Sequence, residues 1–111
     1  PYSVVFPRAA AIVHSGGIGT LAQALAAGRP QLIVPVAFDQ PDNARRTVAL
    51  GIARSLPFRK ATAGAMAREL AALLDVPDCV KRAQAVSRAV TREDGARAAA
   101  DALENAAARR S

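Results

Sequence analysis

Residues 9–36, AAAIVHSGGIGTLAQALAAGRPQLIVPV, decide the fold that this sequence predicts. The stretch begins with a short apolar run, AAAIV, which ends at the polar glycine turn of residues 14–17, HSGG. A short apolar run that ends in a glycine turn is typical of a buried strand. We therefore expect a strand over residues 9–13.

The spacing of the apolar residues changes to that of a helix at Ile18. Gly28 followed by Pro30 predicts where this helix ends. Residues 31–34 are QLIV and are followed by Pro35, so they predict a second buried strand. The expected apolar face of the helix consists of Ile18, Leu21, Ala22 and Leu25.

Strand, turn, helix and strand together form one βαβ unit, which requires a parallel sheet with a right-handed crossover. A second helix is expected to begin near Gln40-Pro41, with Pro41 as its first residue, and to run to a cap at Gly51. A short third strand is expected over residues 52–56. The sequence therefore predicts an α/β fold, a Rossmann-like parallel sheet with flanking helices.

Three more helices are expected after the third strand. Thr62 is a good N-cap for the first, which residues 76–77 end, and Asp78 is expected to cap the second. Residues 93–94, Glu-Asp, are expected to begin the last. The apolar faces of these helices are Met66, Leu70, Leu73 and Leu74; then Cys79, Ala83, Val86 and Val90; then Ala96, Ala99, Ala100 and Leu103.

A length of 111 residues suits one domain, and no linker or internal repeat divides the chain. Hydrophobic residues make up 51% of the sequence but aromatic residues only 4%, so the core must consist of Ala, Val, Leu and Ile. The single cysteine, Cys79, cannot form an internal disulfide. We expect no signal peptide, and no apolar run in the sequence is long enough to span a membrane. We therefore expect a cytoplasmic protein.

The net charge of +6 lies mainly in the first part of the chain. Residues 1–60 hold seven basic and two acidic side chains, whereas residues 61–111 hold eight and seven. Basic residues with interleaved aromatic residues, which would suit a polynucleotide, do not occur there. The excess fits a compact anionic ligand better, although a generally solvated basic surface explains the charge equally well.

The glycine turn between the first strand and its helix has the features of a phosphate site, because free backbone N–H groups and the helix dipole meet there. Thr20 adds a hydroxyl, and His14 can donate an imidazole N–H. The candidate site consists of His14, Gly16, Gly17, Ile18, Gly19 and Thr20. Tight turns also need glycines without any ligand, and a lone histidine beside an apolar strand is more often structural. The pattern alone leaves both explanations open.

A second polar cluster, Asp39, Gln40 and Asn43, follows the next strand and so belongs to the same edge of the sheet. Asp39 and Gln40 offer an acceptor and an amide to sugar hydroxyls. Alternatively, one of them merely caps the helix that starts near Pro41, and local chemistry by itself favours the cap.

The stretch from His14 to Arg46, HSGGIGTLAQALAAGRPQLIVPVAFDQPDNARR, resembles the donor-binding motif of family 1 glycosyltransferases of GT-B fold. The likeness is greatest to bacterial enzymes that glycosylate lipids and natural products, and it continues more loosely to Leu103. Ser15 and Ile18 depart from the family, since many bacterial members have a second His at the first position and plant members have Asn at the second. The matching features are, in order, the glycine turn, Gly28-x-Pro30, Pro35 and Asp39-Gln40.

The resemblance implies that His14 and the glycine turn bind the diphosphate of a nucleotide-diphospho-sugar, while Asp39, Gln40 and Asn43 bind its sugar. It also implies inverting, metal-independent transfer to a hydroxyl of a small molecule or lipid, with the sugar nucleotide as co-substrate and no cofactor. In the family the catalytic base belongs to an N-terminal acceptor domain. Residues 1–111 are therefore expected to be a donor-binding fragment without a catalytic residue of its own, inactive alone.

Two other functions are compatible with the sequence. A stand-alone donor-binding subunit that pairs with a separate acceptor-binding protein would carry the same motif. A basic nucleic-acid-binding module would explain the charge but not the paired polar loops.

Overall fold

The computed structural model describes the backbone of residues 10–110 and the side chains of residues 10–93. At the centre of this part of the chain lies a parallel sheet with strand order β1-β2-β3, made of β1 (Ile12–His14), β2 (Gln31–Ile33) and β3 (Ala53–Ser55). The predicted parallel sheet is confirmed. The first strand is shorter and later than expected, because it begins at Ile12 and includes His14, while residues 10–11 form a bend. Ala9, where it was expected to begin, lies outside the described residues.

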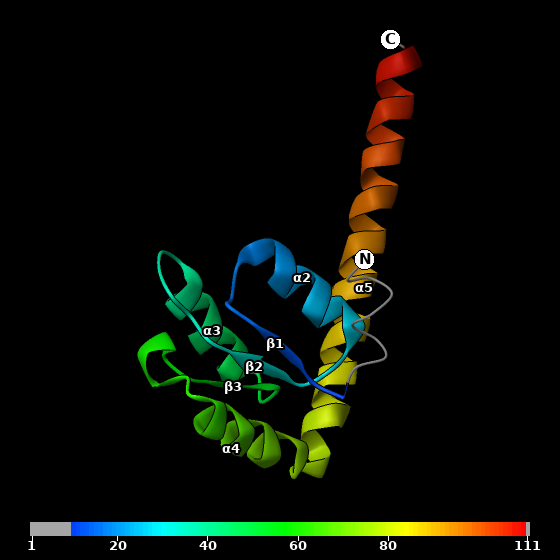
Figure 1. Ribbon diagram of the computed structural model, residues 1–111. Helices are drawn as coiled ribbons and strands as arrows, with labels where there is room; N and C mark the ends of the chain where they lie inside the picture. Colours follow the sequence, from blue (N-terminus) through cyan, green and yellow to red (C-terminus); the bar gives the residue numbers. More distant parts are fainter. Residues whose placement is uncertain (1–9, 111) are drawn as a thin grey trace.

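Helices cover both faces of the sheet (Figure 1). They are α2 (Ile18–Ala27), α3 (Gln40–Ala49), α4 (Ala63–Leu74) and α5 (Pro77–Arg110), with a short 3-10 helix, η2 (Phe58–Lys60), that the sequence analysis missed. Figure 1 shows α2 and α3 on one side and α4 on the other. Helix α5 packs against α2 and α4, and its C-terminal part runs away from the sheet.

The helix ends confirm most of the expected caps. The hydroxyl of Thr62 accepts a hydrogen bond from the backbone N–H of Ala65 at 3.1 Å. Gly28 ends α2 in the left-handed conformation, with φ 70°, and Gly51 follows α3 with φ 75°. Pro41 lies in the first turn of α3, where its missing N–H leaves no bond unmade.

The core lies between the sheet and the helices and consists of small aliphatic side chains. Leu32, Ile33 and Ile52 are fully buried, and Ala44 and Ala83 pack in the same region. Alanines at these contacts let the helices approach the sheet closely, as the low aromatic content predicts.

The expected break before a last helix is wrong, because α5 runs without interruption from Pro77 to Arg110. Residues 93–94 therefore lie inside α5. The expected cap at Asp78 is also wrong, because α5 begins at Pro77 and Asp78 lies in its first turn. Gly95 does not end α5, since a glycine inside a helix costs only about 1 kcal/mol relative to alanine and good helix formers surround it. The expected apolar side chains Ala96, Ala99, Ala100 and Leu103 lie outside the described side chains.

The expected apolar face of α2 is only partly right. Leu21 is buried, but Ile18 is 68% exposed and Ala22 is exposed too. Ile18 lies in the first turn, where it lines with Leu21 and Leu25 a groove of about 300 Å³ between α2 and α3. Ile18 therefore lines this groove instead of packing in the core.

Candidate functional site

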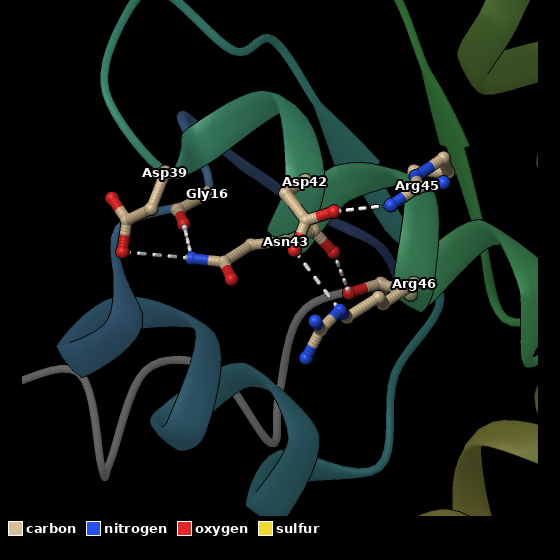
Figure 2. Close-up of polar contacts among 7 residues, drawn as sticks. Gly16, Asp39, Asp42, Asn43, Arg45 and Arg46 are labelled. Carbon is tan, nitrogen blue, oxygen red and sulfur yellow. Dashed lines mark hydrogen bonds and ion pairs between the residues drawn. The ribbon is translucent and has the colours of Figure 1, made fainter.

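The two polar clusters found in the sequence meet at the carboxyl ends of β1 and β2. The side-chain amide of Asn43, in α3, donates a hydrogen bond to the carbonyl oxygen of Gly16 at 2.9 Å (Figure 2). The same amide lies 3.5 Å from a carboxylate oxygen of Asp39. Asn43 therefore joins the glycine turn to the start of α3, and Asp39 lies next to that junction.

The glycines of the turn differ in what the fold requires of them. Gly16 has φ +92°, and an added Cβ would lie 3.1 Å from the carbonyl oxygen of Gln40 and 3.2 Å from a methyl carbon of Ile33. Gly17 and Gly19 have no such constraint, because an added Cβ would have no described atom within 4 Å. Packing within the described chain thus explains Gly16 but not Gly17 or Gly19.

The N-terminus of α2 has no side-chain cap. Its N-cap is Gly17, and its first turn holds no acidic residue. The first hydrogen bond of the helix runs from the N–H of Leu21 to the carbonyl of Gly17. The N–H groups of residues 18–20 precede this bond and lie at the positive end of the helix dipole, which favours an anion.

His14 uses both ring nitrogens inside the protein. Nδ1 accepts a hydrogen bond from the N–H of Gly16 at 3.0 Å, and Nε2 lies 2.7 Å from the side-chain oxygen of Gln31. Burial lowers the pKa of His14 below its ordinary value of 6.5, while the bond to Gln31 acts in the opposite direction. His14 is therefore neutral at pH 7, and its N–H faces Gln31 rather than the open N-terminus of α2.

Gln31 is a site residue that the sequence analysis missed. It is completely buried in β2, although its neighbours in the strand are apolar. A glutamine inside the run QLIV was the signal that might have drawn attention to it.

Asp39 and Gln40 do not cap α3 in the ordinary way. Asp39 occupies the N-cap position, but its side chain makes no cap hydrogen bond. The side-chain oxygen of Gln40 accepts hydrogen bonds from the N–H groups of Val36 and Ala37, at 3.0 and 3.2 Å, and so closes the loop before the helix. The carboxylate of Asp39 is exposed, whereas Gln40 keeps only its amide N–H groups for a ligand.

Asp42 lies nearby but is paired within its own helix. Its carboxylate accepts a hydrogen bond from Arg45 and forms an ion pair with Arg46 at 3.0 Å (Figure 2). The bond from Arg45 is the main cause that lowers the pKa of Asp42, and the charges of both arginines add to it. Among the described residues, no three His, Cys, Asp or Glu side chains form a group that could hold a metal ion.

The parallel sheet and its covering helices match the C-terminal domain of GT-B glycosyltransferases. The crystal structure of the glycotransferase of kitacinnamycin matches with a TM-score of 0.83 and 31% identity, over 95% of this chain and 27% of that chain. Glycosyltransferase VinC in complex with dTDP matches with a TM-score of 0.76 and 32% identity, over 82% of this chain and 23% of that one.

Residues 1–107 match the family described as "Erythromycin biosynthesis protein CIII-like, C-terminal domain", and the chain belongs to this family. The O-mycaminosyltylonolide 6-deoxyallosyltransferase of Streptomyces fradiae is 40% identical over 85% of this chain and 22% of its own length. Glycosyltransferase GtfE of Amycolatopsis orientalis is 42% identical over 90% of this chain and 24% of its own. The chain thus spans about a quarter of these relatives. In the described part of the chain, no helix is long and apolar enough to cross a membrane.

Proposed function

We propose that this chain binds the diphosphate and the sugar of a nucleotide-diphospho-sugar and serves the leaving group in glycosyl transfer. The observation that carries the proposal is the pair Gly17 and Gly19 at an uncapped helix N-terminus. The described fold requires neither glycine, and side chains there would stand between the free N–H groups and an approaching phosphate.

Asp39 is the residue best placed to hold the transferred sugar. Its carboxylate is exposed and linked through Asn43 to the turn that would hold the phosphates. The bonds that Asn43 and Gln40 make within the protein suit them to shaping this region, with their remaining amide atoms available to sugar hydroxyls. The proposed sugar site therefore lies beside the proposed diphosphate site.

The proposed reaction is inverting and needs no metal ion. An acceptor hydroxyl attacks the anomeric carbon, and negative charge grows on the departing diphosphate. The N–H groups at the start of α2 are fixed before the reaction and stabilise this charge as it develops. The catalytic base would belong to an N-terminal acceptor domain, so we expect residues 1–111 alone to transfer no sugar. VinC was crystallised with dTDP, which makes dTDP the first ligand to test.

The diphosphate site is tested by two aspartates at equivalent helix positions. Gly19 is the second residue of α2 and Gly64 the second residue of α4. Aspartate at either position interacts favourably with its helix dipole. In the intact protein, Gly19→Asp should weaken dTDP binding about 100-fold or more, because a carboxylate near the phosphates repels them by up to several kcal/mol. Gly64→Asp should leave the dissociation constant, measured by calorimetry, unchanged. Equal affinities in the two variants would refute a diphosphate site at α2.

The sugar site is tested by comparing the free nucleotide with its sugar conjugate. Asp39→Asn should weaken binding of dTDP-glucose about 10-fold and leave dTDP binding nearly unchanged, since one charge-assisted hydrogen bond is lost. Asp42→Asn, in the first turn of α3, is the matched control and should leave both affinities unchanged. Equal losses for both ligands in Asp39→Asn would assign Asp39 to the structure of the loop instead.

A further inference from the structure

A partly buried hydrogen bond joins β1 and β2 next to the glycine turn. It links His14 to Gln31, two residues that are 17 positions apart in the chain. The register pairs His14 with Ile33, and side chains two apart on a strand share a face, so Gln31 and His14 lie diagonally on the same face of the sheet. The bond therefore depends on the parallel pairing of the two strands.

The hydrogen bonds around His14 are compatible with only one tautomer of its neutral ring. The backbone N–H of Gly16 can only donate, so Nδ1 accepts and carries no proton. In the neutral ring the proton is then on Nε2, which must donate, and the partner at 2.7 Å is the side-chain oxygen of Gln31. If the side-chain amide of Gln31 were flipped, its N–H group would face the Nε2–H group of His14, and no hydrogen bond could form. Gln31 thus complements the same tautomer that the Gly16 amide requires.

Gln31 is expected to lower the stability of the fold relative to an apolar residue at this position. Its side chain is 0% exposed, and its amide nitrogen has no hydrogen-bond partner in the part of the chain that the structure describes. A buried donor without a partner lowers stability, whereas an aliphatic side chain in β2 would avoid that loss. The part of Gln31 that makes a bond is the oxygen that faces His14.

We infer that Gln31 is a positioning residue: its oxygen holds His14 in the Nε2–H tautomer, so that Nδ1 fixes the Gly16 amide and with it the turn that leads into α2. The tautomer itself does not depend on the proposed function. The role of the turn in binding an anion rests on the proposed diphosphate site and deepens it. Histidine acts on the anion through the backbone, and the N–H groups after Gly16 bind it. The carbonyl of Gly16 is held at the same time by Asn43.

The tautomer is measured directly by nitrogen NMR of the intact protein labelled with 15N-histidine, without any ligand. His14 is assigned as the signal that disappears in His14→Asn. We expect the shift of a protonated nitrogen at Nε2 and of an unprotonated nitrogen at Nδ1. In Gln31→Met only the Gly16 amide still favours the Nε2–H tautomer, so a measurable fraction of the protein should carry the proton on Nδ1. In Leu32→Met, a control in the same strand, the wild-type spectrum should persist. A wild-type proton on Nδ1 would overturn the inference whatever the variants do.

Three substitutions of His14 separate an action on the turn from a direct contact to phosphate. The side-chain oxygen of asparagine reaches the place of Nδ1, and the side-chain amide of glutamine reaches that of Nε2. With inorganic pyrophosphate as the ligand, His14→Leu should lose about 10-fold in affinity, the size of one net hydrogen bond, and His14→Asn should rescue most of this loss. Rescue by His14→Gln instead would show that Nε2 contacts the anion and would overturn the positioning role.

Gln31 acts through His14, so the two substitutions should not add. Gln31→Met should weaken pyrophosphate binding about 10-fold in the wild type but less than about 2-fold in the His14→Asn background. Full additivity would show that Gln31 supports the fold only. If the wild-type protein fails to bind pyrophosphate, the proposed function fails, whereas the ligand-free spectra still decide the tautomer.

Discussion

The N-termini of α2 and α4 have similar first turns but different N-caps. Each helix has a glycine as its second residue, and neither has an acidic side chain in its first turn. At α4 the hydroxyl of Thr62 accepts a hydrogen bond from the first turn, whereas at α2 the N-cap is Gly17 and offers no side chain. The cap, rather than the helix, therefore decides whether the N-terminus remains available to an anion.

The largest effect is expected where the chain enters α2. Gly16→Ala places a Cβ at a positive φ and 3.1 Å from a backbone oxygen, so it should lower the free energy of unfolding by about 3 kcal/mol. Gly64→Ala is the counterpart at α4, where an added Cβ meets only the end of Arg68 at 3.8 Å, and it should be neutral or stabilising. Urea denaturation of both variants measures this difference in stability. Similar midpoints for the two variants would contradict the prediction.

A side-chain cap at the N-terminus of α2, like the one that Thr62 provides for α4, should weaken anion binding. Gly17 has φ −63° and ψ 142°, close to the angles of Thr62, and has open space for a side chain. In Gly17→Thr the new hydroxyl should accept from the first turn of α2 and compete with a phosphate. We expect pyrophosphate to bind about 10-fold more weakly, the size of one net hydrogen bond. Unchanged calorimetric affinity would mean that these N–H groups do not bind the anion.

Removal of the N-cap of α4 should lower stability and leave ligand affinity unchanged. Thr62→Ala removes the cap and should lower the free energy of unfolding by about 1 kcal/mol, the usual value of such a cap. Its dissociation constant for dTDP should equal that of the wild type. A loss of dTDP affinity in this variant would show that the two helix ends are coupled.

The smallest difference concerns pH. Burial lowers the pKa of His14, so below about pH 6.5 the unfolded chain takes up a proton more readily than the folded one. Stability supplied through the turn before α2 should therefore fall as the pH falls, whereas the Thr62 cap of α4 does not titrate. Between about pH 7.5 and about pH 5.5, the wild type should lose more stability than His14→Asn. Identical pH profiles would contradict this assignment.

Local patterns were sufficient to predict the parallel sheet, the glycine turn and most of the helix ends. The run before His14, the change of spacing at Ile18 and the Thr62 cap each depend on residues that are close in the chain. The exception is α5, where acidic residues 93–94 resembled a helix start. Such residues are also ordinary inside a long helix, so composition alone does not locate a helix boundary there.

The details of the site depend on contacts between distant residues and were not predictable in the same way. Nothing near His14 in the sequence indicates that Gln31, 17 positions away, accepts from its ring. Gln40 illustrates a second difficulty, because its oxygen turns back to Val36 and Ala37 and leaves only its N–H groups free. The sequence directs attention to these residues, but which of their atoms are already bonded within the protein is known only from the folded chain.

The pairing of Gln31 with His14 also ties the shape of the turn before α2 to the register of the sheet. A slip of one residue between β1 and β2 would turn Gln31 to the opposite face of the sheet, out of reach of the histidine. The link from Asn43 to Gly16 likewise spans 27 positions and forms only when α3 is docked. The turn would therefore reach its final geometry only in chains in which the strands are paired in the correct register and α3 has packed on the sheet.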